Sequence, residues 1–181
     1  MSRALIFPGQ GSQRVGMGKE MYDAFGISRQ VFEEVNDTLG QNLSRLMFEG
    51  PENELTLTEN AQPALMTVSI AIVRALEQEG SQAISGIAQF VAGHSLGEYS
   101  ALAAAGAISL PDTARLLKCR GVAMQNAVAI GDGRMTAILG LGLDEVVKIA
   151  EMASDKGICE IANDNAPGQI VLSGQSAAIE R

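Results

Sequence analysis

The sequence has 181 residues, and its 13 lysines and arginines against 21 aspartates and glutamates leave a net charge of −8. Hydrophobic residues make up 46% of the chain and charged residues 19%, which is typical of a folded globular protein. The acidic charge and the scarcity of aromatic residues argue against a nucleic-acid partner. No apolar run has the length of a membrane span, no secretory signal is evident, and the two cysteines predict neither a disulfide framework nor a metal site. We therefore expect a cytoplasmic protein.

The first 130 residues are expected to form a larger domain that contains both strands and helices. The apolar run at 3–7 predicts a short strand, which Pro8 and Gly9 end. Apolar residues at three- to four-residue spacing predict helices, and Ser28 and Gly40 are the expected N-cap and C′ residue of one of them. In chain order the predicted elements are a strand at 3–7, helices at 17–25, 28–39 and 61–79, a strand at 88–92, and helices at 98–105 and 111–128.

A glycine-rich break at 131–133 marks a candidate boundary, so residues 131–181 are expected to form a second, smaller domain. The predicted order there is strand, helix, strand, strand and a short final helix, with strands at 135–139, 158–162 and 169–173 and a helix at 144–153. This order begins a ferredoxin-like split βαβ unit, and the last strand of that unit is missing. We expect the small domain to be incomplete.

The segment Gly93-His94-Ser95-Leu96-Gly97 has the G-x-S-x-G pattern of a nucleophile elbow. A predicted strand precedes it and a predicted helix follows, as an elbow requires. The hydroxyl of Ser95 would then project at the end of the strand, and the N–H of Leu96 could hold an oxyanion. The alternative is a glycine-rich turn that holds an inert serine. His94, the one histidine of the chain, is expected to line the pocket or support the turn, because neighbours in an elbow point in different directions.

Five segments together resemble the malonyl-CoA:acyl-carrier-protein transacylase family, the acyltransferases of fatty-acid and polyketide synthesis. They are FPGQGSQ at 7–13, LTLTENAQPAL at 55–65, GHSLGEYSALAAAG at 93–106, LLKCRGVAMQ at 116–125 and NDNAPGQIVLSG at 163–174. The resemblance implies an α/β-hydrolase-like parallel-sheet subdomain with an inserted ferredoxin-like subdomain. It also implies a reaction in which Ser95 takes malonyl from malonyl-CoA as an O-malonyl ester and passes it to the phosphopantetheine thiol of acyl carrier protein.

The resemblance also implies roles for residues that match the family's motifs. Arg120 matches the arginine that pairs with the malonyl carboxylate, and the alternative is an ordinary surface arginine on an amphipathic helix. The backbone N–H groups of Gln10 and Leu96 match the oxyanion hole, although a glycine-rich turn alone would explain the segment around Gln10. Gln62 matches a glutamine near the acyl pocket, or is simply a residue at the start of a helix. Asn163 could line a cleft between the subdomains, but we favour a turn between two strands for it. The methionines and both cysteines are expected to fill the core.

The family's catalytic base is a histidine that follows the small subdomain, and the 181 residues hold no match to it. We therefore expect an N-terminal portion of a transacylase, inactive or weakly active by itself. The resemblance further implies malonyl-CoA and acyl carrier protein as substrates, no cofactor, and a monomer at full length. Two alternatives stay open. One is a serine hydrolase or esterase that uses the same elbow. The other is a non-catalytic fragment that binds acyl-CoA or a carrier protein through a basic patch of Arg115, Lys118 and Arg120.

Overall fold

The structure is a computed structural model that describes residues 2–129 and 131–181. The described residues form two compact units, which divide between Gln125 and Asn126. Residue 130, where we expect the larger domain to end, lies outside the described residues. None of the described helices is long and apolar enough to cross a membrane.

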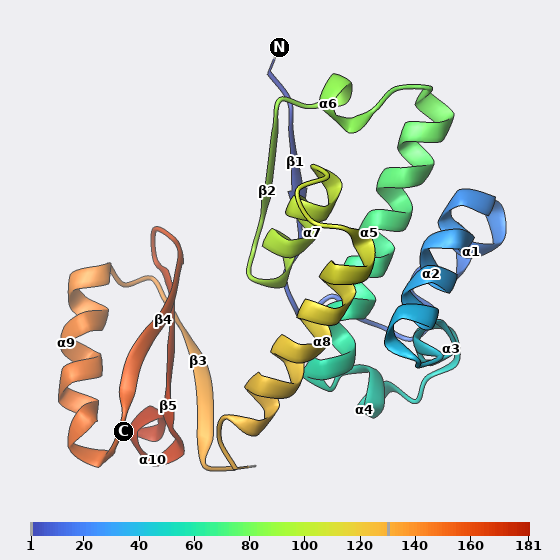
Figure 1. Ribbon diagram of the computed structural model, residues 1–181. Coiled ribbons are helices and arrows are strands. Elements are labelled where there is room, and N and C mark those ends of the chain that lie inside the picture. The colour runs from blue at the N-terminus through green and yellow to red at the C-terminus, as the bar shows by residue number, and fades with distance from the viewer. Residues whose placement is uncertain (1, 130) are drawn as a thin grey trace. The chain divides into compact units, whose positions relative to one another are not determined.

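The first unit contains two parallel strands and a group of helices (Figure 1). Its elements are β1 (Ala4–Phe7), α1 (Lys19–Ala24), α2 (Gly26–Leu39), α3 (Leu43–Glu49), α4 (Glu52–Leu55), α5 (Thr58–Gly80), α6 (Ile84–Ile87), β2 (Phe90–Gly93), α7 (Leu96–Ala104) and α8 (Leu110–Asn126). The expected strands and long helices are therefore present. The short helices α3, α4 and α6 were not predicted, because one or two turns hold too few residues to show a helical period. The side chain of Asn42 caps α3 by accepting a hydrogen bond from the N–H of Arg45 at 3.1 Å.

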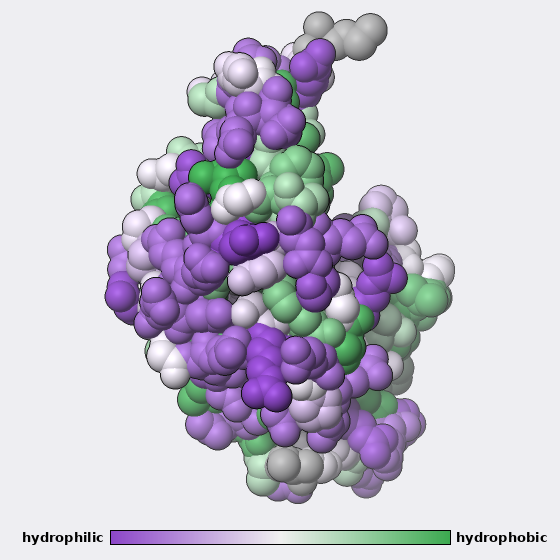
Figure 2. Space-filling view, turned by 90° about the vertical axis from the view of Figure 1, so that its right-hand side faces the viewer, coloured by the Kyte–Doolittle hydropathy of each residue, from purple (hydrophilic) through white to green (hydrophobic). Residues whose placement is uncertain are grey.

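The long helix α5 forms the centre of this unit, with α2 and α7 both packed against it. The apolar face of α2, including Val31 and Phe32, belongs to the same buried cluster as residues from α3, α5, α7 and α8. The opposite side of α2 is charged and exposed, and hydrophilic side chains make up most of the face of the molecule on which α2 lies (Figure 2). The amphipathic pattern of residues 28–39 therefore correctly predicts which side of this helix is buried.

The predicted N-cap of α2 is wrong, whereas its predicted C-terminal glycine is confirmed. The helix begins earlier, with Phe25 as its N-cap, and Ser28 lies inside it. Ser28 is fully buried, and its hydroxyl donates a hydrogen bond to the carbonyl of Ala71 on α5 at 2.9 Å. Gly40 ends the helix in the left-handed conformation with φ 58°.

The second unit is a three-stranded antiparallel sheet with helices packed against it. Its elements are β3 (Gly133–Leu139), α9 (Leu143–Ala153), a 3₁₀ turn (Ser154–Lys156), β4 (Cys159–Ala166), β5 (Gln169–Gln175) and α10 (Ser176–Glu180). The strand order β3-β5-β4 confirms the expected split βαβ arrangement, because β5 lies between the two strands that α9 connects. Val146, Ile170 and Leu172 lie at the centre of its core.

The turn predicted around Asn163 is wrong. The strand β4 extends to Ala166, and Asn163 lies within it, opposite Val171 on β5. The turn falls at 167–168, where Gly168 has φ 77°. The pairing of β4 with β5 shifts register on either side of residues 163–164, so the strand tolerates the Asn and Asp residues that suggested a turn.

Candidate active site

A sharp turn between β2 and α7 presents Ser95. The strand β2 ends at Gly93 and the helix α7 begins at Leu96. Ser95 lies between them with φ 55° and ψ −112°, a combination that residues other than glycine rarely adopt. Such a backbone costs about 1–3 kcal/mol and persists only where the surroundings impose it. The geometry is that of a strained nucleophile elbow.

The two glycines of the elbow leave room for this turn. A Cβ atom at Gly93 would overlap the carbonyl group of Gly97, and a Cβ atom at Gly97 would overlap the carbonyl oxygen of Phe7 at the end of β1. Neither glycine has a positive φ, so close packing, and not backbone conformation, requires them. The elbow is thus pressed against the end of the neighbouring strand, which holds Ser95 in place.

A guanidinium group from α8 lies beside the serine. Nη2 of Arg120 donates a hydrogen bond to Oγ of Ser95 at 2.8 Å, and Nη1 donates to Oε1 of Gln62 at 2.5 Å. Gln62 is fully buried in α5, whereas Ser95 and Arg120 are half-buried. The guanidinium carbon also lies 5.9 Å from the centre of the Tyr99 ring, within the range of a cation–π contact. The structure therefore brings Ser95, Arg120 and Gln62 together from three separate elements.

The position of Arg120 depends on how closely α8 approaches the start of α5. A Cβ atom at Gly121 would lie 2.5 Å from Cα of Glu59, so only glycine allows this approach without a shift. One turn earlier, the ammonium of Lys118 forms an ion pair with Glu59 at 2.9 Å and donates to Oδ1 of Asn60 at 3.1 Å. Packing and charge together thus hold the two helices where Arg120 and Gln62 can meet.

The loop after β1 lies next to the elbow. The strands β1 and β2 are parallel and in register, with Phe7 paired to Gly93, so the segments that follow them begin side by side. The backbone N–H of His94 donates to the carbonyl of Phe7 at 3.2 Å. A Cβ atom at Gly9 would lie 2.6 Å from Nδ1 of His94, which places the imidazole against the loop. The exposed side chain of Gln10 donates from Nε2 to Oγ1 of Thr58 at 3.3 Å.

A model of the acyl transferase domain family matches residues 4–181. This chain belongs to the acyl transferase domain family. Among the curated relatives of this acyl transferase chain is the malonyl CoA-acyl carrier protein transacylase of Bacillus subtilis, which is 46% identical over 178 residues. The transacylase of the same name from Escherichia coli K12 is 44% identical over 178 residues. The alignments cover 98% of this chain but only 55% and 56% of these relatives, so the chain spans about half of their length.

Solved structures of acyl transferases agree with the fold. The acyl-carrier-protein S-malonyltransferase of Bartonella henselae superposes with a TM-score of 0.95 at 57% identity, over 99% of this chain and 57% of that one. A type II polyketide synthase acyl-carrier protein in complex with its malonyl-transacylase is another match. It has a TM-score of 0.91 and 41% identity, over 99% of this chain and 57% of that one. The mixed α/β fold class expected from the sequence is therefore confirmed.

Three other predicted site residues of this acyl transferase chain lie on separate segments: Leu96, Gln10 and Asn163. Leu96 is buried and opens α7, and the first N–H groups of a helix have no partner within the helix. Gln10 lies in the loop beside the elbow. Asn163 is half-buried on β4 of the second unit. The roles proposed for these residues, and for His94, stay predictions.

Sequence reasoning missed three residues around Arg120: Tyr99, Gly121 and Met124. The sulfur of Met124 accepts a hydrogen bond from Nε2 of Gln62 at 3.3 Å, although we expected the methionines only to fill the core. Met124 is 48% exposed and so is no core filler. Spacing alone could have indicated two of the three, because Tyr99 follows Ser95 and Met124 follows Arg120 by one helical turn.

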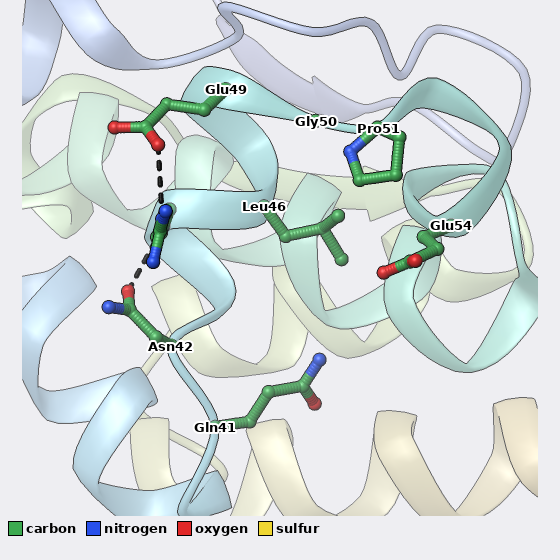
Figure 3. Close-up of a pocket in the computed structure, with 8 residues that line it drawn as sticks. Gln41, Asn42, Leu46, Glu49, Gly50, Pro51 and Glu54 are labelled. Carbon is green, nitrogen blue, oxygen red and sulfur yellow. Dashed lines mark hydrogen bonds and ion pairs between the residues drawn. The ribbon is translucent and has the colours of Figure 1, made fainter.

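Two hollows in the first unit are lined by neither Ser95 nor Arg120. One, of about 550 Å³, lies over α3 and α4 and includes Gln41, Leu46 and Glu54 (Figure 3). Two of its polar side chains already have partners on α3. Asn42 caps the helix by accepting from the N–H of Arg45, and Glu49 forms an ion pair with the Arg45 side chain. The other, of about 310 Å³, is apolar and lies between β1 and α5. Across the described residues, no group of three or more His, Cys, Asp or Glu side chains could hold a metal ion.

Proposed function

We propose that this chain carries the nucleophile and the carboxylate-recognition residue of a malonyl-CoA:acyl-carrier-protein transacylase. The hydrogen bond between Arg120 and Ser95 is the observation that carries the proposal. In a malonyl thioester, one methylene group separates the reactive carbonyl carbon from the carboxylate. An enzyme that acylates a serine with malonyl therefore needs a cation within a few ångströms of that serine, and Arg120 meets this requirement. Its planar guanidinium suits a carboxylate.

The proposed reaction has two halves. Oγ of Ser95 attacks the thioester carbonyl carbon of malonyl-CoA, and the negative charge that develops on the carbonyl oxygen is held by the N–H groups of Leu96 and Gln10. Collapse of this intermediate breaks the C–S bond, releases the CoA thiol and leaves O-malonyl-Ser95. The phosphopantetheine thiol of an acyl carrier protein then attacks the ester carbonyl and forms a new C–S bond. The acyl C–O bond to Oγ of Ser95 breaks, and Oγ takes up a proton to regenerate the serine hydroxyl. No cofactor is needed for these steps.

In the first half the hydroxyl proton of Ser95 must pass to a base, and in the second half Oγ of Ser95 must take a proton back. His94 is the one histidine in the 181 residues, and its imidazole lies against Gly9. We therefore expect the 181 residues alone to acylate slowly, helped by the oxyanion hole and the arginine.

Intact-mass measurement after incubation of the chain with malonyl-CoA tests the proposal. We expect slow labelling by one malonyl group, confined to the peptide that contains Ser95, and no labelling of a Ser95→Ala variant. Rapid stoichiometric labelling would contradict the expectation that the chain alone is slow. Labelling at another residue, or equal labelling by acetyl-CoA and malonyl-CoA, would contradict the assignment of Ser95 and Arg120.

Hydrolase activity is a weaker candidate, because a hydrolase of neutral esters has no use for a guanidinium beside its serine. Comparing release of free malonate with transfer to a carrier thiol separates the two.

The contacts of the basic residues argue against the non-catalytic alternative. Of the three residues of the expected patch, Arg115 is paired with Asp112 at 3.1 Å and Lys118 with Glu59, whereas Arg120 contacts the neutral side chains of Gln62 and Ser95. Titration with an unacylated carrier protein tests it, and binding that survives loss of Arg115 and Lys118 would exclude that patch.

A further inference from the structure

The amide of Gln62 is held between two partners with opposite requirements. Nη1 of Arg120 can only donate, and it lies 2.5 Å from the amide oxygen. Sδ of Met124 can only accept, and it lies 3.3 Å from the amide nitrogen. The side chain of Gln62 is fully buried, so water does not replace either partner. The two contacts therefore favour one of the two orientations of the amide.

A reversed amide would be costly in this place. It would turn the NH₂ group toward the guanidinium, so that donor faces donor, and would turn the oxygen toward the sulfur lone pairs. A buried donor without an acceptor costs about 1–3 kcal/mol. Arg120 favours the observed orientation from one side, and Met124 favours it from the other.

The helix α8 supplies both contacts. Arg120 and Met124 are separated by one helical turn, so their side chains lie on the same side of α8 and bracket Gln62 on α5. A leucine at 124 would match the size and hydrophobicity of the methionine but would have no acceptor. Packing alone therefore does not require a methionine at a position that is 48% exposed.

We propose that Met124 is a positioning residue for carboxylate recognition. Its thioether orients the amide of Gln62, the amide oxygen anchors Nη1 of Arg120, and Nη2 is thereby kept on the side of Ser95. The inference rests on the proposed function, because it takes Arg120 as the group that binds the malonyl carboxylate. Met124 itself need not touch the substrate.

Replacing Met124 by leucine and by glutamine tests this role. Met124→Leu removes the acceptor at nearly constant size, and Met124→Gln restores an acceptor oxygen at similar length. Met152→Leu is the control, because Met152 is also exposed, at 63%, and lies on α9 in the second unit. Thermal unfolding of each variant monitors the fold.

The first measurement is hydrogen exchange of the Gln62 side-chain NH₂ protons by NMR, which needs no enzymatic activity. We expect exchange to become about tenfold faster in Met124→Leu, as for a donor that has lost its acceptor. It should return to within about twofold of the original rate in Met124→Gln and stay unchanged in Met152→Leu. Unchanged exchange in Met124→Leu, or equally fast exchange in both Met124 variants, would overturn the inference.

The second measurement is the ratio of dissociation constants for malonyl-CoA and acetyl-CoA. Met124→Leu should lower the preference for malonyl-CoA by about five- to tenfold, and Met124→Gln should restore it. If the original chain shows no preference, or keeps it in Arg120→Ala, the proposed function fails, and the exchange data still decide whether Met124 orients Gln62. If Arg120→Ala loses the preference but Met124→Leu keeps it, the function stands and Met124 has no positioning role.

Discussion

Nη2 of Arg120 and Oγ of Ser95 lie 2.8 Å apart, although the two residues come from different elements of the first unit. The serine comes from a strained turn, and the arginine comes from a helix that a glycine allows to pack closely. A neutral acyl group offers nothing to this cation, whereas a malonyl group carries a carboxylate next to its reactive carbonyl. The pair thus places a cation that can bind the carboxylate of the acyl donor next to the nucleophile.

Replacing Arg120 by alanine should remove discrimination between charged and neutral acyl groups. The loss of a charge-assisted hydrogen bond is worth about 2 kcal/mol, so the ratio of Ser95 labelling rates with malonyl-CoA and acetyl-CoA should fall roughly thirtyfold. Arg120→Lys should restore only part of it, because an ammonium lacks the planar fork. Labelling rates from intact mass provide the measurement, and the exposed Arg115→Ala is the control.

Two substitutions at Ser95 separate its chemistry from its strain. Both Ser95→Ala and Ser95→Gly should abolish labelling by malonyl-CoA. Ser95→Gly should be more stable than Ser95→Ala by about 1 kcal/mol, because glycine adopts φ 55° without the penalty that a Cβ atom brings. Chemical denaturation of the two variants measures the difference. Equal stability would mean that the elbow stores no strain.

The packing of the elbow against β1 should make Gly97 sensitive to a single added carbon. In Gly97→Ala the new Cβ atom overlaps the carbonyl oxygen of Phe7. We expect the free energy of unfolding to fall by about 1–3 kcal/mol, and labelling of Ser95 to slow because the turn is displaced. Gly26→Ala is the control: nothing lies within 4 Å of its added carbon, and the change should be neutral or slightly stabilising.

A similar substitution at Gly121 tests the approach of α8 to α5. A Cβ atom there would push α8 away from Glu59 and move Arg120 with it. Gly121→Ala should lower the free energy of unfolding by about 1–3 kcal/mol and reduce the preference for malonyl-CoA. Gly80→Ala, at the open end of α5, should leave the preference unchanged and the free energy of unfolding unchanged or slightly higher. A variant that lost stability but kept its preference would show that Arg120 adjusts to the shift.

Local patterns predict the long elements of this chain well, because their apolar periods reflect burial. They fail where a contact distant in sequence decides the outcome. Serine is a typical N-cap residue, but the hydroxyl of Ser28 donates its hydrogen bond to the carbonyl of Ala71 on α5. Ser28 can therefore lie inside α2. The segment that begins at Asn163 has the composition of a turn, but its backbone pairs with β5, so β4 extends beyond Asn163. The motifs predict which residues gather at the site, but the amide of Gln62 and the sulfur of Met124 meet only through packing.

The register of the two parallel strands sets a limit on how this chain can be changed. Because Phe7 is level with Gly93, the loop that carries Gln10 and the turn that carries Ser95 start from the same height. One residue inserted into β1 would raise its loop by about 3.3 Å and turn its side chains to the opposite face. Insertions in the surface turn at 81–83 would leave both segments where they are. Protein engineering should therefore add length in this surface turn and never within the strands.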